Sequence, residues 1–189
     1  ELSREGMLPG WRNEDYPVKT GFAAEPLFRM ERSAVPHFGV RAYGVHMNGF
    51  VRRADGIHMW VGRRSFVKPT YPGMLDNMVA GGQPIGLSLK ANLIKECDEE
   101  AAVPAELAQR AVPVSAITYC LEGEGGLKPN VQFCFDLELP DSFVPHNRDG
   151  EIHEFYLWPI ARVAETVRDT REFKFNCNLV IIDFLIRHG

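Results

Sequence analysis

The stretch GGQPIGLSLKANLIKECDEEAAV, residues 81–103, decides the fold because it joins a glycine-rich loop to a regularly patterned helix. Apolar residues recur there at every fourth position: Leu89, Leu93, Cys97 and Ala101. This spacing places them in one stripe that can pack on a hydrophobic core. Ser88 is of a residue type favoured at the N-cap. The sequence therefore predicts a helix over residues 88–101.

The same helix carries three glutamates on an adjoining stripe. Glu96, Glu99 and Glu100 stand at i, i+3 and i+4, and like charges at these spacings destabilise a helix by ~0.2–0.5 kcal/mol per pair. A bound cation would remove this penalty. A solvated acidic face is the alternative, and for an isolated E-x-x-E-E motif it is the simpler interpretation. The rest of the sequence has to decide between the two.

One ordinary domain accounts for the length of the chain. With 189 residues, of which 45% are hydrophobic, the sequence can build one substantial core, whereas two full domains would be cramped. Residues 1–38 are rich in proline, glycine and charge, which predicts an irregular N-terminal extension packed on a domain of residues 39–189. The four cysteines have no C-x-x-C spacing, so reduced buried thiols are favoured over disulfides or a zinc site.

The charge and hydropathy patterns argue against several classes of partner and location. A net charge of −4 does not suit a general nucleic-acid or anionic-membrane binder, which needs a basic face. The most apolar run, residues 179–186, contains Asp183 and is too short to span a bilayer. The sequence does not open with a signal-peptide pattern. These features predict a cytoplasmic protein that binds neither nucleic acid nor membranes.

Strand patterns lie on both sides of the acidic helix. Residues 40–51 and 57–61 alternate or are β-branched, and the turn at residues 54–56 joins them into a predicted hairpin. Further elements are expected downstream of the helix: strands at residues 112–121, 131–139 and 153–158, and helices at residues 160–168 and 178–187. This order predicts an α/β fold with helices on both faces of one mixed sheet.

The loop and helix together resemble the Nudix box, whose pattern is G-x5-E-x7-R-E-U-x-E-E-x-G-U, where U is a bulky apolar residue. Gly81 falls on the first glycine, and Glu96, Glu99 and Glu100 fall on the three later glutamates. The stretch GEIHEFYLWPI, residues 150–160, is similar to the strand that follows the box in this family. The resemblance implies the Nudix fold, an α-β-α sandwich around a mixed sheet.

Three positions depart from the box. Leu87 replaces the first glutamate, Lys95 the arginine and Ala102 the second glycine. Leu87 removes a carboxylate, and the point charge of Lys95 cannot grip a carboxylate through two donors. If residue 102 adopts the left-handed conformation of a helix C-cap, alanine costs ~1 kcal/mol relative to glycine. These departures support a non-catalytic, Nudix-like binding module as an alternative to an enzyme.

A narrower resemblance covers nearly the whole chain. The stretches GWRNEDYPV, AYGVHMNGFV, TYPGMLDNMVAGG and FNCNLVIIDFLIRHG resemble the Nudix branch related to the domain fused to fungal thiamine pyrophosphokinase. In that branch an apolar residue at the first-glutamate position and lysine at the arginine position are ordinary. The resemblance implies hydrolysis of thiamine diphosphate, and especially of its oxidised analogues, to the monophosphates. ADP-ribose or another nucleotide-type diphosphate remains an alternative substrate, because pocket residues decide specificity.

Hydrolysis of a diphosphate calls for divalent cations that neutralise charge and activate water. Glu96, Glu99 and Glu100 are the expected metal ligands and catalytic residues for Mg²⁺ or Mn²⁺, which prefer oxygen ligands, and the backbone carbonyl near Gly81 can add another. Glu154 is a candidate further ligand or general base. The alternatives are that Glu154 and its neighbour Glu151 are exposed carboxylates, or that the base is Glu122 or Glu124 on a loop.

Substrate contacts are expected from the strand and loop that precede the box. Arg63, Arg64 and Lys68 could hold phosphate oxygens, although surface charge explains any one of them equally well. Aromatic side chains of the same segment could stack on a ring or face a cationic one: Trp60, Phe66 and Tyr71. Core packing is their alternative role. The expected partner is a small-molecule diphosphate, together with a possible second copy in a homodimer.

A Nudix-fold isomerase of isopentenyl diphosphate is a third functional class. That activity relies on a catalytic cysteine in a motif that this sequence does not contain. The leading hypothesis is therefore a metal-dependent pyrophosphohydrolase.

Overall fold

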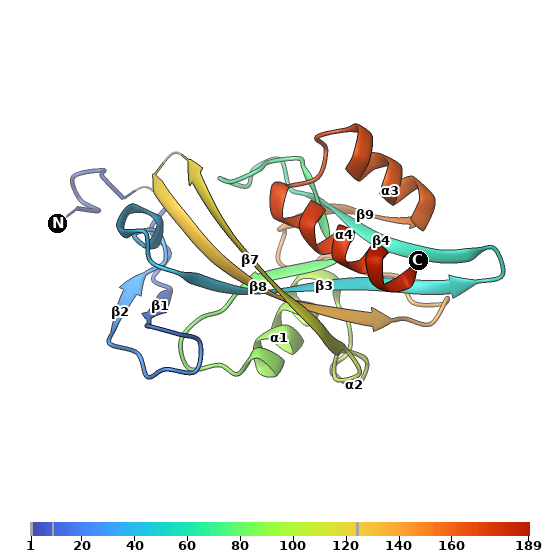
Figure 1. Cartoon of the computed structure of the whole chain (residues 1–189), viewed down its shortest axis with the longest axis horizontal. Coiled ribbons are helices and arrows are strands. Elements are labelled where there is room, and N and C mark those ends of the chain that lie inside the picture. The colour runs from blue at the N-terminus through green and yellow to red at the C-terminus, as the bar shows by residue number, and fades with distance from the viewer. Residues whose placement is uncertain (1, 9, 124) are drawn as a thin grey trace.

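The structure is a computed structural model that describes residues 2–8, 10–123 and 125–189 (Figure 1). Seven strands form one mixed sheet: β3 (Ala42–Arg53), β4 (Gly56–Arg64), β5 (Leu75–Asn77), β6 (Val79–Gly82), β7 (Val112–Gly123), β8 (Gly126–Glu138) and β9 (Ile152–Pro159). The path runs β5-β4-β3-β8-β7, with β6 paired to β3 and β9 paired to β4. The β3–β8 pair is parallel and the others are antiparallel. The predicted mixed sheet is confirmed.

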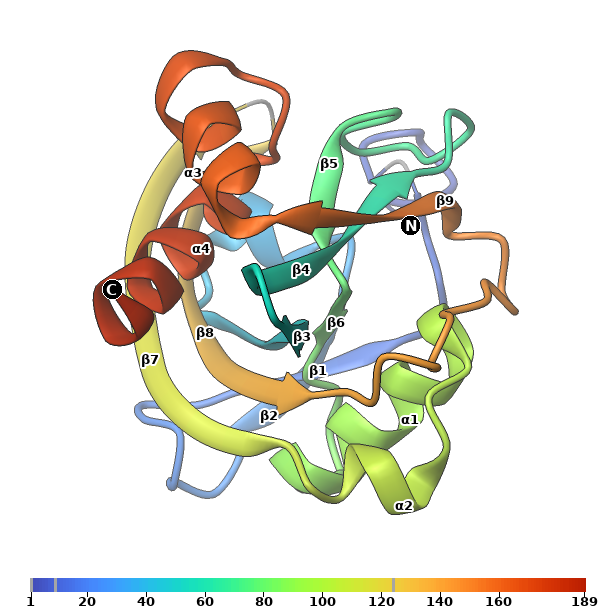
Figure 2. The same ribbon diagram turned by 90° about the vertical axis from the view of Figure 1, so that its right-hand side faces the viewer.

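Helices cover both faces of the sheet, as predicted (Figure 2). The first pair, α1 (Leu89–Ala101) and α2 (Ala105–Ala108), packs on one core and contributes side chains such as Leu93 and Cys97. The second pair, α3 (Ile160–Asp169) and α4 (Phe175–His188), covers a separate core and buries Phe184. The four-residue spacing of apolar side chains in α1 thus gives the buried stripe expected from the sequence.

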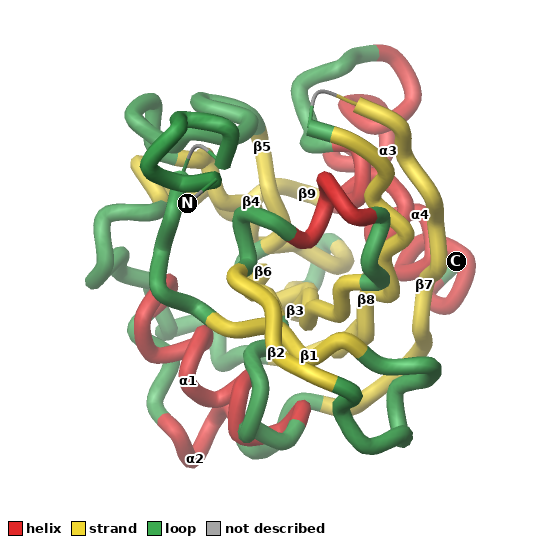
Figure 3. Tube along the Cα trace, turned by 90° about the vertical axis from the view of Figure 1, so that its left-hand side faces the viewer, coloured by secondary structure: helices red, strands yellow, loops and turns green. Residues whose placement is uncertain are grey.

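The N-terminal part of the chain is more regular than the sequence suggests. It forms β1 (Asp15–Val18) and β2 (Phe28–Glu31), which pair in antiparallel register, followed by the 3-10 helix η1 (Val35–Phe38). The two strands lie beside β6 and β3 in Figure 3. A Cβ added to Gly82 of β6 would lie 1.7 Å from the Tyr16 hydroxyl, so β1 packs directly on the sheet at a glycine. The predicted irregular segment is therefore a hairpin in contact with the sheet.

The helices and the cysteines can be compared with what the sequence predicts about membrane spans and disulfides. Within the described part of the chain, no helix has both the length and the apolar content to cross a bilayer. All four cysteines are free thiols. Cys97, Cys134 and Cys177 are buried, as predicted, whereas Cys120 is exposed, which departs from the prediction.

Candidate active site

The acidic helix α1 is capped at both ends. The Ser88 hydroxyl accepts a hydrogen bond from the Ala91 N–H at 3.1 Å, as its N-cap position predicts. At the other end Ala102 is left-handed, with φ 51°, and its N–H donates to the Asp98 carbonyl at 3.1 Å. Alanine in this conformation costs ~1 kcal/mol relative to glycine. The helix therefore ends where the box glycine would end it, at a residue that is less suited to the turn.

Gly81 brings the backbone of β6 against Glu96. A Cβ on Gly81 would lie 2.3 Å from the carboxyl carbon of Glu96, a distance that no side chain could tolerate. The glycine is required by this close approach and not by its backbone angles. The structure thus brings together Gly81 and the first helix glutamate, which sequence analysis assigned to one metal site.

The three helix glutamates differ in how much of each side chain is exposed to solvent. Glu100 is only 4% exposed and accepts a hydrogen bond from the Ala80 N–H at 2.8 Å. Burial raises the pKa of Glu100 well above its ordinary value and also raises the pKa of Glu96. The Lys95 ammonium lies 2.6 Å from a Glu99 oxygen and 3.3 Å from a Glu96 oxygen. Lys95 therefore bridges two of the three carboxylates as a point charge.

These residues line an acidic cavity of about 370 Å³ between α1, β6 and the N-terminal segment. Six carboxylates line it: Glu14, Glu96, Glu99, Glu100, Asp149 and Glu151. Three of its basic residues are Arg12, Arg32 and Lys95. Carboxylate oxygens are the ligands that Mg²⁺ and Mn²⁺ prefer. The donor set therefore fits a divalent cation, which would offset the burial that raises the pKa of Glu96 and Glu100.

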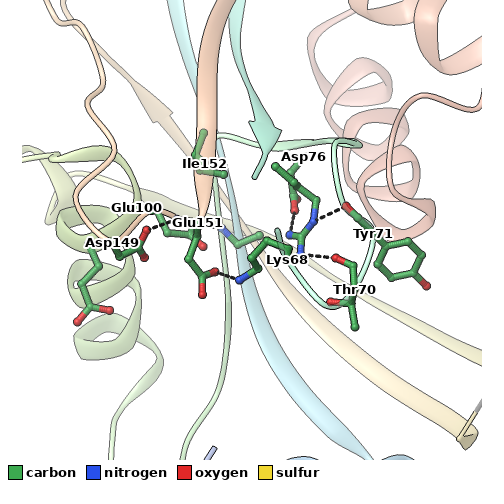
Figure 4. A network of polar contacts seen from close by, with 12 residues as sticks. Lys68, Thr70, Tyr71, Asp76, Glu100, Asp149, Glu151 and Ile152 are labelled. Carbon is green, nitrogen blue, oxygen red and sulfur yellow. Dashed lines mark hydrogen bonds and ion pairs between the residues drawn. The ribbon is translucent and has the colours of Figure 1, made fainter. Parts of the chain in front are cut away.

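The acidic residue that precedes β9 in this cavity is Glu151, and Glu154 lies elsewhere. Glu154 is exposed, lies opposite Arg63 in the β4–β9 register and accepts a hydrogen bond from the Tyr156 hydroxyl at 2.8 Å. Glu151 pairs with Lys68 and is seen beside Glu100 in Figure 4. Burial opposes ionisation of Glu151, but the hydrogen bond and charge of Lys68 outweigh it and lower its pKa.

The structure thus differs from the expectation for Glu154, because the chain enters the cavity in the turn before the strand and not within it. In this turn the Gly150 N–H donates to the Asn147 side chain at 3.0 Å. The Asn-x-x-Gly spacing is the sequence signal that could have located the turn. Of the two rival bases, Glu122 lies on β7 and does not line the acidic cavity, and Glu124 lies outside the described residues.

Arg63 and Arg64, expected to bind phosphate, use their donor nitrogens within the protein. Arg63 donates to the Tyr156 hydroxyl at 3.2 Å and to the Gly73 carbonyl at 2.8 Å. Arg64 donates to the carbonyls of Tyr71 and Thr70 at 3.0 and 2.9 Å, and to Asp76 at 2.7 Å (Figure 4). Both guanidinium groups therefore fix the loop that connects β4 to β5.

The aromatic candidates of the same segment separate into buried and exposed ones. Trp60 is 8% exposed, packs in the core beneath α1 and does not line the acidic cavity. Phe66 is exposed and contacts the His153 ring edge-on at 5.2 Å between centroids. Tyr71 has φ 53° and lines a cavity with Lys68. The structure thus corrects the expectation for Trp60 and brings Lys68 and Tyr71 together.

Two further cavities, of about 200 and 230 Å³, adjoin the acidic one and share Arg32 and Ala80 with it. We call the three cavities together the groove. The basic residues that line the two further cavities are Arg12, Arg32, Arg64, Lys68, Lys128 and Lys174. Its aromatic lining is Tyr16, Tyr43, Tyr71, Tyr119 and Phe175. Sequence analysis missed most of these residues because they come from segments far apart in the chain.

A second buried group of polar residues lies behind the groove around Asp76. Ligand atoms of His46, Asp76 and Cys177 lie within 4.8 Å of one another, which is the spacing of a possible metal site. Asp76, however, already pairs with Arg64 and Lys174, each at 2.7 Å. Burial and the charge of Lys174 lower the pKa of His46 to about 4. We therefore assign the Asp76 group to structure, because two cations leave no charge at Asp76 for a third.

The chain is similar to several known proteins. The chain is 53% identical over 188 residues to Nudix hydrolase 20, chloroplastic, and 50% identical over 188 residues to Nudix hydrolase 24, chloroplastic, both from Arabidopsis thaliana. All of this chain is covered, but it spans only 50% and 52% of those proteins. A family described as a domain of unknown function (DUF4743) matches residues 1–42.

Among solved structures, the Nudix domain of Shewanella oneidensis NrtR complexed with ADP ribose matches with a TM-score of 0.62 and 14% identity. The match covers 79% of this chain and 90% of that domain. The fold is therefore the Nudix fold. Both plant relatives are named Nudix hydrolases, and the solved domain shares its fold with this chain. The predicted cytoplasmic location is corrected, because both plant relatives are named chloroplastic.

Proposed function

We propose that the chain is a divalent-metal-dependent Nudix pyrophosphohydrolase that cleaves a phosphoanhydride bond. The observation that supports this most is the acidic cavity, where Glu96, Glu99 and Glu100 lie with Asp149 and Glu151, and where burial raises the pKa of Glu96 and Glu100. Glu96, Glu99 and Glu100 would hold the metal, with Gly81 allowing the backbone to approach. Bound there, Mg²⁺ or Mn²⁺ would neutralise charge on the diphosphate and activate a water molecule.

The chain's own residues supply the remaining functions. Glu151 is our candidate for the general base in place of Glu154, because it lines the acidic cavity and faces the helix glutamates. Lys68 pairs with Glu151 and lines the adjoining cavity, so it can orient this carboxylate and also meet a phosphate. Leu87 is 39% exposed and does not line the acidic cavity, so the missing box carboxylate does not weaken the proposal.

For the substrate we propose thiamine diphosphate or its oxidised analogues, which are cleaved to the monophosphate and phosphate. The groove offers both kinds of group that such a molecule needs: carboxylates for metal at one end, and cations with aromatic rings beyond them. Tyr71, Tyr119 and Phe175 are the rings of one adjoining cavity, and the last two contact each other edge-on at 5.7 Å. ADP-ribose is the second candidate, since a Nudix domain of the same fold binds it.

Competition at equal substrate concentration tests the assignment, because specificity is a ratio of kcat/KM values. Thiamine diphosphate, an oxidised analogue and ADP-ribose would be incubated together with enzyme and Mg²⁺, and each monophosphate quantified. We expect the thiamine-type compounds to disappear first and all reaction to stop on metal chelation. Preferential loss of ADP-ribose would reject the thiamine proposal alone. Absence of hydrolysis with every diphosphate would favour the binding-module alternative.

A further inference from the structure

Two arginines from the N-terminal segment line the groove, although the Nudix box lies some 50 residues or more further along the chain. Arg12 precedes β1, and Arg32 follows β2. Both line the acidic cavity and the cavity next to it, and Arg32 also lines the third. Both lie close enough to Glu151 to help lower its pKa. The segment therefore places positive charge opposite the helix glutamates.

These arginines differ from those of β4 in how many donors the protein uses. Arg64 commits its Nε, Nη1 and Nη2 atoms to internal partners. Within the described residues, the Arg32 side chain donates one hydrogen bond, to Glu14 at 2.7 Å, and the Arg12 side chain donates none. A guanidinium group carries five N–H donors. Arg32 thus retains donors for a ligand, and its side chain is 37% exposed.

The segment also holds these arginines in place. Glu31 is 8% exposed, and its carboxylate accepts hydrogen bonds from the backbone N–H groups of Arg12, Glu14 and Ser33, at 3.0, 3.2 and 3.2 Å. One carboxylate therefore ties together the chain on both sides of the hairpin. The Arg32 guanidinium lies 5.5 Å from the centre of the Tyr16 ring, which packs on Gly82. Such fixed geometry reduces the ordering cost of binding an anion.

We propose that the N-terminal segment is part of the substrate site, in which Arg32, assisted by Arg12, binds the phosphate groups of the diphosphate opposite the helix glutamates. This inference rests on the proposed function for the identity of the ligand. Planar guanidinium donors match phosphate oxygens in pairs, which a lysine cannot do. The region that matches a domain of unknown function would thereby have a role in binding.

The test uses the whole chain with Arg32→Gln, and Arg29→Gln as the matched control. Arg29 lies on the same hairpin, is exposed and does not line the groove. Affinity for methylenediphosphonate, a diphosphate mimic that cannot be hydrolysed, would be measured by calorimetry with Mg²⁺ present. We expect Arg32→Gln to weaken binding about 10-fold or more, as for loss of charge-assisted hydrogen bonds, and Arg29→Gln to leave it within about twofold. Arg32→Lys should restore affinity only in part.

Equal affinities for Arg32→Gln and Arg29→Gln would overturn the inference. If Arg32→Gln does not fold, as shown by its melting curve, Arg12→Gln replaces it, because the Arg12 side chain is exposed and supports no internal hydrogen bond among the described residues. Binding and hydrolysis are read separately. Loss of diphosphonate affinity without any hydrolysis by wild type would reject the proposed function and keep the inference, whereas normal hydrolysis with an unaffected Arg32→Gln variant would do the reverse.

Discussion

Two buried carboxylates, Asp76 and Glu100, lie near each other and are treated oppositely by the fold. Asp76, 1% exposed, receives ion pairs from Lys174 and Arg64, which with His46 outweigh the effect of burial and lower its pKa. Glu100, 4% exposed, accepts one backbone hydrogen bond, and burial raises its pKa. The fold neutralises the first charge with its own cations, whereas the proposed function leaves the second to a divalent cation. On this ground we assign Asp76 a structural role and propose a functional role for Glu100.

The largest expected effect is on stability, and it concerns Asp76. Asp76→Asn leaves Lys174 and Arg64 buried without their counter-charge, so we expect the free energy of unfolding to fall by about 3–5 kcal/mol. Urea denaturation followed by circular dichroism measures it. Asp141→Asn is the control, because the Asp141 pair with Arg53 is exposed and should contribute about 1 kcal/mol or less. An unchanged urea midpoint in Asp76→Asn would remove the structural assignment.

The opposite response is expected in the acidic cavity. Glu100→Gln keeps the oxygen that accepts from the Ala80 N–H but removes a metal ligand. Turnover should fall by about 100-fold or more, since even supporting residues of metal sites cost 10–100-fold. Unfolding free energy without divalent metal should match or exceed that of wild type, because the cost of burying a carboxylate is removed, together with its repulsion by Asp76 and Glu96. Glu99→Gln should lower turnover in the same direction, and wild-type turnover in both variants would reject the metal site.

The Asp76 group should also make the stability of the protein depend on pH, through His46. His46 has a pKa of about 4 when folded and an ordinary pKa of 6.5. Between these values the unfolded chain takes up a proton that the native protein does not, so stability falls as pH decreases. The loss from this residue between pH 7 and pH 5 should be about 2 kcal/mol. His46→Gln should remove that part of the slope in urea denaturation, and parallel pH profiles would contradict the buried neutral histidine.

The smallest effect is expected at Leu87. Its side chain lies outside the acidic cavity, beside Pro17 and Lys19, so Leu87→Glu adds a carboxylate where no metal ligand is expected. Steady-state kinetics with Mg²⁺ should show kcat/KM within about threefold of wild type, since changes at exposed positions away from a site are usually near neutral. A large gain in rate would show that the box has lost a functional ligand.

Elements with strong local patterns were predictable from the sequence. The helix expected over residues 88–101 is α1, Leu89–Ala101, because its N-cap and apolar stripe are local signals. The turn expected at residues 54–56 joins β3 to β4, with Arg53 opposite Gly56. The helix expected to begin at residue 178 begins earlier, at Phe175. The sequence did not indicate this start because Lys174, at the N-cap, lacks the usual capping side chain. Short-range regularity carried these predictions.

Contacts between distant segments were not predictable in this way. The β1–β2 hairpin is defined by pairs such as Asp15 with Glu31, and its proline and glycine content concealed both strands. Arg32 reaches the groove only because this hairpin packs on β6. Arg64 looked free in the sequence, yet its partner Asp76 lies 12 residues away on another strand. Which cations bind a ligand depends on which ones the fold has already used.

The carboxylate of Glu31 has a further consequence for motion of the N-terminal segment. It accepts from three amides, at Arg12, Glu14 and Ser33, so their protons are protected by one shared group. Hydrogen exchange at these positions should therefore follow a common opening event with a single rate, instead of three independent ones. That opening event also frees the chain on both sides of the hairpin. Its equilibrium constant therefore gives the fraction of molecules in which the N-terminal segment does not line the groove.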